Sequence, residues 1–250
     1  MSQWFKKITI GLTISIFTSG IFHASAADHI VPSAGNHPDN QIRVVTGGYE
    51  AIAADNEQRE ISGPRTTAVK NFLHAQGFTF KIDTMLWSRA YNIIHNSNDN
   101  ILIYPLTRTK EREAHFQWVK KIDEHHFNLL SHVSVNANEL TKADIISGKY
   151  FAVCETTTSN CHMLLDYGFP DENIFRISGV EVDGIVMRLA LGRASFMMEN
   201  YEIVSNIAKR IKSLEGKIEK VHNVTVVMED YLAAKSLSPN VHARLTQNVH

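Results

Sequence analysis

The chain has 250 residues, and its 25 basic residues nearly balance its 26 acidic ones, which leaves a formal net charge of −1. Such a balance argues against a nucleic-acid partner, because nucleic-acid binding usually requires a basic face. The length is sufficient for one large domain or for two lobes with their own cores.

The first residues have the pattern of an export signal. Lys6 and Lys7 precede an apolar run over residues 8–22, and Ala24-Ser25-Ala26 follows as a small-x-small cleavage sequence. A membrane anchor is the alternative, but the run is shorter than the ~20 residues that a spanning helix needs. We therefore expect residues 1–26 to be a signal peptide. The mature protein would reside in a bacterial periplasm and span no membrane.

Strand and helix patterns alternate at the start of the mature chain. The expected elements are a strand at 42–46, a helix at 64–76, a strand at 78–82, a helix at 86–96 and a strand from 101 that breaks at Pro105. A Gly-rich bend after the first strand exposes Tyr49. This order predicts an α/β protein whose sheet is mainly parallel, with helices on its faces.

Hydroxyl and guanidinium groups follow the third strand. Thr107 and Arg112 come directly after it, and open α/β sheets hold their ligands at the carboxyl ends of the strands. Trp87, at the start of the preceding helix, should lie near the same strand ends. The planar fork of an Arg can donate two parallel hydrogen bonds to a carboxylate. Arg112 is therefore the first ligand-binding candidate, with a salt bridge to Glu111 or Glu113 as the alternative.

A largely polar segment at 119–135 predicts irregular structure, and we place the first crossing between two lobes within it, around 129–135. A second alternating series follows. Its expected elements are a helix at 140–148, a strand at 150–153, a helix ending at 167, a strand at 173–177, a helix at 183–191, a strand tip at Asn200 and a helix at 203–211. Residues 217–227 would return the chain to the first lobe, before a strand at 230–235 and a helix that begins at Ser238-Pro239.

The loop between Cys154 and Cys161 is rich in hydroxyl groups. Thr156 and Thr157 lie in it, directly before a predicted helix. Free backbone N–H groups and the helix dipole make such a loop a natural anion site, whereas a cluster of N-capping side chains is the alternative. In an oxidising compartment we expect the two cysteines to form a disulfide, with two buried thiols as the alternative.

The residues named so far also carry a family resemblance. The pattern Thr107-x-Thr109-x-x-Arg112 after a buried strand, together with Trp87-Ser88-Arg89 and Phe116-Gln117-Trp118, resembles the extracellular solute-binding proteins of family three. These are the polar amino-acid receptors of ABC transporters. The resemblance extends over about residues 41–240. It implies a periplasmic-binding-protein-like fold with two α/β lobes, mainly parallel sheets and a two-crossing hinge, divided into 41–128 plus 224–250 and 129–223.

The resemblance also implies roles for individual residues. Arg112 would bind the ligand carboxylate with Thr107 as hydroxyl partner, and Tyr49 and Trp87 would enclose its apolar part. From the second lobe, Thr156 and Thr157 would close on the carboxylate, and Asn200 would contact the other end of the ligand. Thr156 stands where the family usually has Gly, and Asn200 stands where it usually has Asp.

The resemblance implies a monomer that captures an amino-acid-like or carboxylate ligand for an ABC permease. A sensory input module is one alternative. Another is a dehydratase or lyase on the same fold, with Glu50, Glu155 and Glu199 as acid or base candidates. Metal transport is a further alternative because the chain has 13 His, but these are scattered. We expect neither a metal nor a cofactor.

Overall fold

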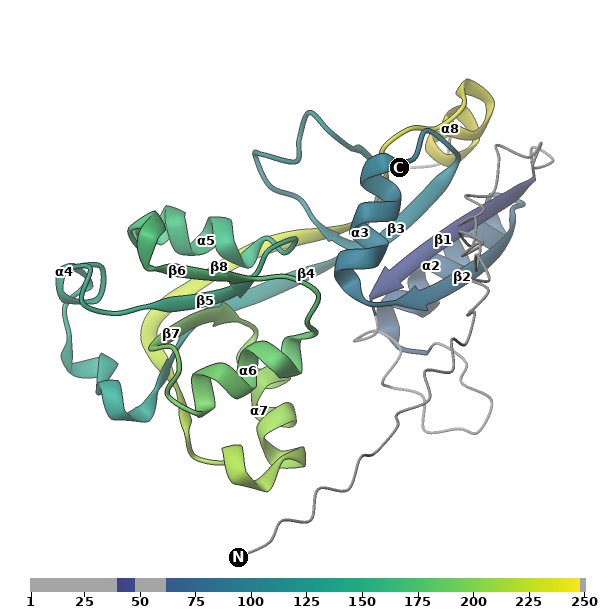
Figure 1. Ribbon diagram of the computed structural model, residues 1–250. Helices are drawn as coiled ribbons and strands as arrows, with labels where there is room; N and C mark the ends of the chain where they lie inside the picture. Colours follow the sequence, from purple (N-terminus) through teal and green to yellow (C-terminus); the bar gives the residue numbers. More distant parts are fainter. Residues whose placement is uncertain (1–39, 48–61, 248–250) are drawn as a thin grey trace, which may run out of the picture. The chain divides into compact units, whose positions relative to one another are not determined.

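The computed structural model describes residues 40–47 and 62–247, which belong to one compact unit. Their strands form one sheet with the order β2-β1-β3-β8-β4-β7-β5-β6 (Figure 1). The strands are β1 (Gln41–Gly47), β2 (Thr79–Met85), β3 (Ile101–Thr107), β4 (Gln117–His132), β5 (Ala152–Glu155), β6 (Ile174–Ile177), β7 (Phe196–Glu199) and β8 (Ile218–Ala234).

Seven α-helices accompany these strands in the described ranges. They are α2 (Pro64–Ala75), α3 (Trp87–Asn96), α4 (Lys142–Ile145), α5 (Asn160–Tyr167), α6 (Val182–Ala190), α7 (Tyr201–Arg210) and α8 (Pro239–Thr246). Short 3₁₀ helices lie at Val133–Val135, Ala137–Glu139, Asp171–Asn173 and Lys212–Leu214. None of the helices in this part of the chain is long and apolar enough to cross a bilayer.

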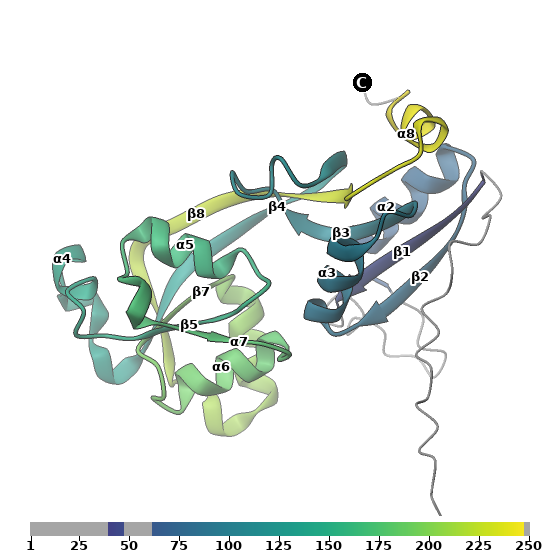
Figure 2. The same cartoon turned by 45° about the horizontal axis from the view of Figure 1, so that its top comes forward.

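The first half of the sheet consists of the parallel strands β2, β1 and β3. Alternate residues of β1 point to opposite faces: Val44 packs with residues of α2 and α8, whereas Val45 packs with residues of α3. Residues of β3 alternate in the same way: Leu102 packs with residues of α2 and α8, and Ile103 packs with residues of α3. Both faces of this half are therefore covered by helices, as Figure 2 shows.

The second half repeats this arrangement with the parallel strands β7, β5 and β6. Phe196 and Met198 of β7 pack with residues of α5, and the intervening Met197 packs with residues of α6 and α7. Each half of the sheet thus has its own apolar core on both faces, and no described cluster joins the helices of one half to those of the other. The predicted α/β class is confirmed.

Two long strands, β4 and β8, connect the halves. They pair with each other in antiparallel orientation, and β8 also pairs with β3 while β4 pairs with β7. The expectation of irregular structure at 119–135 is therefore wrong. Polar side chains are accommodated in this strand through contacts beside the ladder, since Lys121 contacts both Glu124 and Glu229 at 2.8 Å. The same pairing makes one mixed sheet out of the two mainly parallel sheets that were expected.

The third strand does not stop at Pro105. β3 continues to Thr107, and its pairing with β8 shifts register between Ile103 and Leu106. A Pro is tolerated in such a bulge because no ladder hydrogen bond is required from its nitrogen. As a consequence Thr107, which was expected in the following loop, is the last residue of the strand.

Candidate functional site

A cleft lies where strands from both halves end. The last residues of four strands line it, namely Gly47 of β1, Thr107 of β3, Glu155 of β5 and Glu199 of β7. It contains about 900 Å³ of space, including the part that is open to solvent. This is the position in which open α/β sheets place their ligands.

Arg112 reaches this cleft from the loop after β3. Its side chain lies over the ring of Tyr91, with 5.2 Å between the guanidinium carbon and the ring centroid, and the residue is only 5% exposed. Nη1 donates to the carbonyl of Thr107 at 3.0 Å, and Nη2 donates to the carbonyl of Thr157 at 2.8 Å. No acidic side chain forms an ion pair with it in the described ranges, and burial lowers the pKa of the guanidinium. The alternative salt bridge is thus not present: Glu113 pairs with Arg108 instead.

The two halves touch through Trp87 and the loop after β5. The indole Nε1 of Trp87 donates to the carbonyl of Thr157 at 3.4 Å, and its backbone N–H donates to Oε1 of Glu181 at 3.3 Å. Gly47 lies close to the indole, and a Cβ at residue 47 would lie 3.3 Å from its Cε3 atom, so a larger residue there would require the ring to shift slightly. Trp87 therefore lines the cleft and also binds the opposite side.

The hydroxyl groups of Thr156, Thr157 and Thr158, in the loop after β5, are bound to other groups of the protein. Thr157 donates both its backbone N–H and its Oγ1 to Oε2 of Glu155, each at 2.7 Å. The exposed Thr156 pairs through Oγ1 with Ser178, and it does not line the cleft. The geometry thus differs from the expected anion site: Thr157 presents its carbonyl oxygen to Arg112, and the side chains that line the cleft from this loop are Glu155, Thr158 and Ser159.

Asn200 has a structural role in this arrangement. Its Oδ1 accepts the N–H of Ile203 at 3.1 Å as the N-cap of α7, and its Nδ2 donates to the carbonyl of His126 at 3.1 Å. It is not among the residues that line the cleft, whereas the preceding Glu199 is. Glu199 is the last residue of β7, so the alternation of side chains along the strand does not fix where its carboxylate points.

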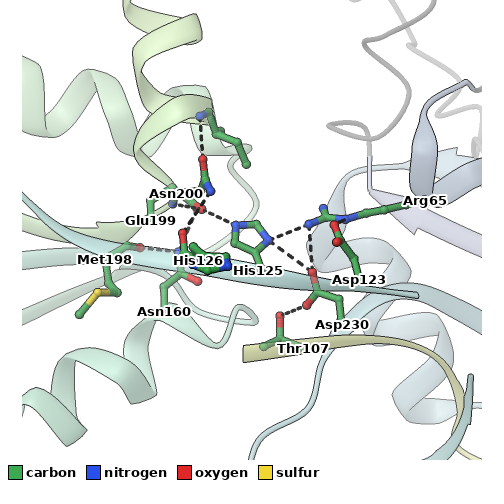
Figure 3. Close-up of polar contacts among 11 residues, drawn as sticks. Arg65, Thr107, Asp123, His125, His126, Asn160, Met198, Glu199, Asn200 and Asp230 are labelled. Atoms are coloured by element: carbon green, nitrogen blue, oxygen red, sulfur yellow. Dashed lines mark hydrogen bonds and ion pairs between the residues drawn. The ribbon is translucent and has the colours of Figure 1, made fainter. Parts of the chain in front are cut away.

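His125 of β4 occupies the middle of a polar network at the base of the cleft (Figure 3). Its Nε2 lies 3.7 Å from Oε1 of Glu199, and its Nδ1 lies 3.3 Å from Oδ2 of Asp230 and 2.9 Å from Nη2 of Arg65. Nδ1 accepts from Arg65 when the ring is neutral and donates to Asp230 when it is charged. Burial alone would lower the pKa of His125, but hydrogen bonds and charges from Asp230 and Glu199 raise it to about 9.

Asp230 and Glu199 make further contacts in this network. Asp230 accepts from Thr107 Oγ1 at 2.8 Å and lies 3.2 Å from Nη2 of Arg65. Asn160 donates to Oε2 of Glu199 at 3.0 Å. Thr107 was expected to offer its hydroxyl to a ligand, but this hydroxyl is bound to Asp230. The network therefore brings side chains from β3, β7 and β8 together around His125 of β4.

Cys154 and Cys161 form a disulfide, which confirms the sequence prediction. Their Cα atoms are 5.4 Å apart, and the bond joins the end of β5 to the first turn of α5. Glu155 and the whole loop lie inside the ring that this bond closes. The disulfide therefore restrains the loop that carries Glu155 into the cleft.

Several residues of the cleft were not predicted as ligand-binding residues. Asp230 was recognised only as part of a returning strand, His125 lay in the segment that was expected to be irregular, and nothing in the sequence singled out Glu181. Glu155 was named only as a possible catalytic group. Tyr49 lies outside the described residues. Within those residues, no three side chains of His, Cys, Asp and Glu are grouped as metal ligands.

Solved structures share the fold of this chain, and they include the following three. The putative L-cystine ABC transporter from Listeria monocytogenes has a TM-score of 0.62 and 15% identity, over 83% of this chain and 88% of that chain. The arginine-, lysine-, histidine-binding protein ArtJ from Geobacillus stearothermophilus has a TM-score of 0.63 and 12% identity, over 83% and 87%. A histidine kinase sensor domain with similarity to periplasmic binding proteins has a TM-score of 0.65 and 9% identity, over 84% and 89%.

These likenesses establish the periplasmic-binding-protein-like fold that the sequence predicted. No protein-family model matches the chain, and no curated protein sequence matches it.

Proposed function

We propose that this chain is an exported solute-binding protein that captures a small polar ligand in the cleft and delivers it to an ABC permease. The observation that carries the proposal is the cleft itself, which is lined by the carboxyl ends of strands from both halves of the sheet. A fold with two cores and two connecting strands is suited to closing on a ligand, because each half can move as a body. Neighbours with this fold include a cystine transporter protein and an arginine-, lysine-, histidine-binding protein.

We propose lobe boundaries at 128/129 and 223/224, in the strands β4 and β8. Support comes from the ladder between them, whose register shifts between Asn128 and Leu130. Asn128 pairs with Thr225 and Leu130 pairs with Lys220, so additional β8 residues bulge out between these pairs. Asn223 lies in this bulge with a φ of 60°. Few regular hydrogen bonds would have to change for the strands to bend here.

The ligand contacts in this proposal begin with Arg112 and Trp87. Arg112 is buried at the cleft and its Nη2 bond to Thr157 is one that a ligand oxygen can replace. Trp87 supplies an apolar wall, and Tyr49 remains the predicted second aromatic side. Thr107 acts by holding Asp230. Thr156 and Asn200 are engaged elsewhere, so we assign them no direct ligand contact.

The localisation and partners follow from the N-terminal pattern and the fold. We propose that residues 1–26 are removed on export and that the protein acts as a periplasmic monomer. Mass spectrometry of the protein isolated from the periplasm should show an N-terminus at Ala27. An uncleaved chain in the membrane fraction would contradict this part of the proposal.

A thermal-shift screen of the processed protein tests the binding function. The library should contain amino acids, small peptides, carboxylates and divalent metal salts, and hits should be verified by isothermal titration calorimetry. We expect at least one small polar compound to raise the melting temperature and to be recovered unchanged. Conversion of the bound compound would favour an enzyme, and stabilisation only by metal salts would favour metal transport.

A sensory role is the second candidate, because a histidine kinase sensor domain is among the structures with this fold. Deletion of the gene separates the two roles. Loss of uptake of the labelled ligand indicates transport. Unchanged uptake with a lost transcriptional response to the ligand indicates a sensor.

A further inference from the structure

Four acidic side chains of the described residues line the cleft, and two of them contact cationic side chains. Asp230 is matched by Arg65 and His125, and Glu199 contacts His125 and Asn160. Two carboxylates of the second half remain, Glu155 and Glu181. In the part of the chain that the structure describes, neither forms an ion pair with Lys, Arg or His.

Glu155 is the more constrained of the two. It is 5% exposed, and its Oε2 is held by Thr157. Its Oε1 is buried and has no hydrogen-bond partner within residues 40–47 and 62–247. A buried carboxylate oxygen without a partner is unfavourable, because it has lost its water and gained nothing in exchange. Such an atom at the wall of a cleft indicates that the partner is supplied by a ligand.

Glu181 lies near Glu155 and, like it, carries a carboxyl group. Its Oε1 accepts the weak 3.3 Å bond from the Trp87 backbone. Burial raises the pKa of the Glu181 carboxyl, and the nearby charges of Asp183 and Glu155 raise it further. These effects mean that this side of the cleft has more negative charge than it can neutralise, and a cation placed there would relieve the repulsion.

The cationic side chains of the cleft do not meet this need. Arg112 donates to the carbonyls of Thr107 and Thr157, and Arg65 and His125 are bound to Asp230. The apolar side chains on the same side come from Val180, Val182, Ile185 and Ile203. Together they suit a short hydrocarbon chain that ends in a positive charge.

We infer that the ligand carries an ammonium or guanidinium group, which binds between Glu155 and Glu181 in the second half of the cleft. This inference rests on the proposed binding function and specifies its ligand class as a small organic cation. Any carboxylate on the ligand would lie toward Arg112. A purely anionic ligand is excluded by this arrangement, because it would have to approach two unpaired carboxylates.

Matched pairs of probes test the inference. L-arginine and L-citrulline have similar shapes, but only arginine carries the guanidinium charge, and agmatine and putrescine add cations without a carboxylate. Succinate and L-glutamate represent anions. Each should be tested up to 10 mM by thermal shift and calorimetry on the processed protein. We expect at least one cationic probe to bind at least tenfold more tightly than citrulline, with no binding of succinate.

Two variants locate the charge, and a third controls for the substitution itself. Glu155→Gln and Glu181→Gln should each weaken the cationic probe tenfold or more. Glu155→Gln should leave the melting temperature of the ligand-free protein unchanged or higher, because it removes a buried charge that lacks a partner. Glu172→Gln changes an exposed carboxylate outside the cleft and should leave affinity unchanged.

The outcomes distinguish the inference from the function on which it rests. Tight binding of neutral or anionic compounds with no response to the cations would overturn the inference and leave the binding function standing. Full affinity for a cation in both Gln variants would overturn the assigned residues. A protein that binds no compound of any charge in the screen would overturn the proposed function and the inference with it.

Discussion

Arg112 and Thr157 come from opposite halves of the sheet and meet through a hydrogen bond of 2.8 Å between Nη2 and the Thr157 carbonyl. The N–H and Oγ1 of Thr157 are held in turn by Glu155. A buried guanidinium of one half is therefore linked to a buried carboxylate of the other through a single residue. A ligand that displaces the Thr157 carbonyl from Arg112 would therefore act on the same residue that holds Glu155.

Replacing Arg112 tests this link. Arg112→Ala removes two hydrogen bonds from a charged donor, each worth about 1.5–3 kcal/mol. We expect the free energy of unfolding to fall by about 3 kcal/mol, measured by urea titration, because the loss is partly offset by relief of a buried charge. The thermal stabilisation by ligand should disappear. Undiminished affinity in this variant would exclude Arg112 from the site.

Arg108 provides the matched control for that experiment. It lies four residues before Arg112 in the same loop. In contrast to Arg112, it pairs with Glu113 and does not line the cleft. Arg108→Ala removes a partly exposed ion pair, and exposed pairs contribute about 0–1 kcal/mol. It also removes the contacts of the guanidinium with the rings of Trp118 and Tyr231. Its ligand-induced thermal shift should equal that of the wild type.

The charge of His125 should make stability depend on pH. Its pKa is raised from 6.5 to about 9 in the folded protein. The stabilisation from the protonated ring is therefore fully present below pH 6.5, and it is lost as the pH rises through about 9. It amounts to on the order of 3 kcal/mol. The free energy of unfolding of the wild type should decrease over this range relative to that of His125→Gln, which cannot take up the proton.

The measurement is the difference between the two proteins, because other groups titrate in both. Urea titrations at half-unit steps between pH 6 and pH 10 are sufficient. Parallel curves over the whole range would mean that His125 is neutral and that its Nδ1 accepts from Arg65. A separation that closes as the pH rises would identify the charged ring.

The disulfide between Cys154 and Cys161 should stabilise the protein by about 2 kcal/mol, as the loop-entropy relation gives for so short a ring. Adding a phosphine reductant should lower the urea midpoint of the wild type. The double variant Cys154→Ser/Cys161→Ser should have the lower midpoint already and show no further response. An equal response to reductant in both proteins would mean that the bond is not present.

Variants at Asn200 test whether its side chain caps α7 or contacts the ligand. Asn200→Ala removes the acceptor for the Ile203 N–H, and loss of an N-cap costs about 1 kcal/mol. We expect this decrease in the free energy of unfolding with a ligand affinity within twofold of the wild type. Asn200→Asp, which retains a capping oxygen, should recover most of the stability. A tenfold loss of affinity in Asn200→Ala at unchanged stability would place the side chain on the ligand instead.

Local patterns were sufficient to predict much of the fold. Helices α2, α5 and α6 end where Gly77, Gly168 and Gly192 follow with positive φ, as the sequence indicated, because few other residues adopt that conformation without strain. The long strand β4 was missed because its residues do not alternate clearly between polar and apolar. Its conformation depends on pairing with β8, which lies about a hundred residues further along the chain.

The residues of the candidate site also fall into two groups: those that local sequence patterns placed and those that only long-range contacts placed. The sequence by itself determined that Arg112 and Trp87 lie at the ends of the first strands and that Cys154 and Cys161 are close enough to bond, because these relationships depend on neighbouring elements. Only the tertiary structure decided that the Thr107 hydroxyl serves Asp230, 123 residues away, and that His125 lies between two carboxylates. The same holds for Glu155 and Glu181, which have no cationic partner among the described residues. Such contacts depend on which strand ends meet, and the long-range pairing of β3, β4, β7 and β8 sets that.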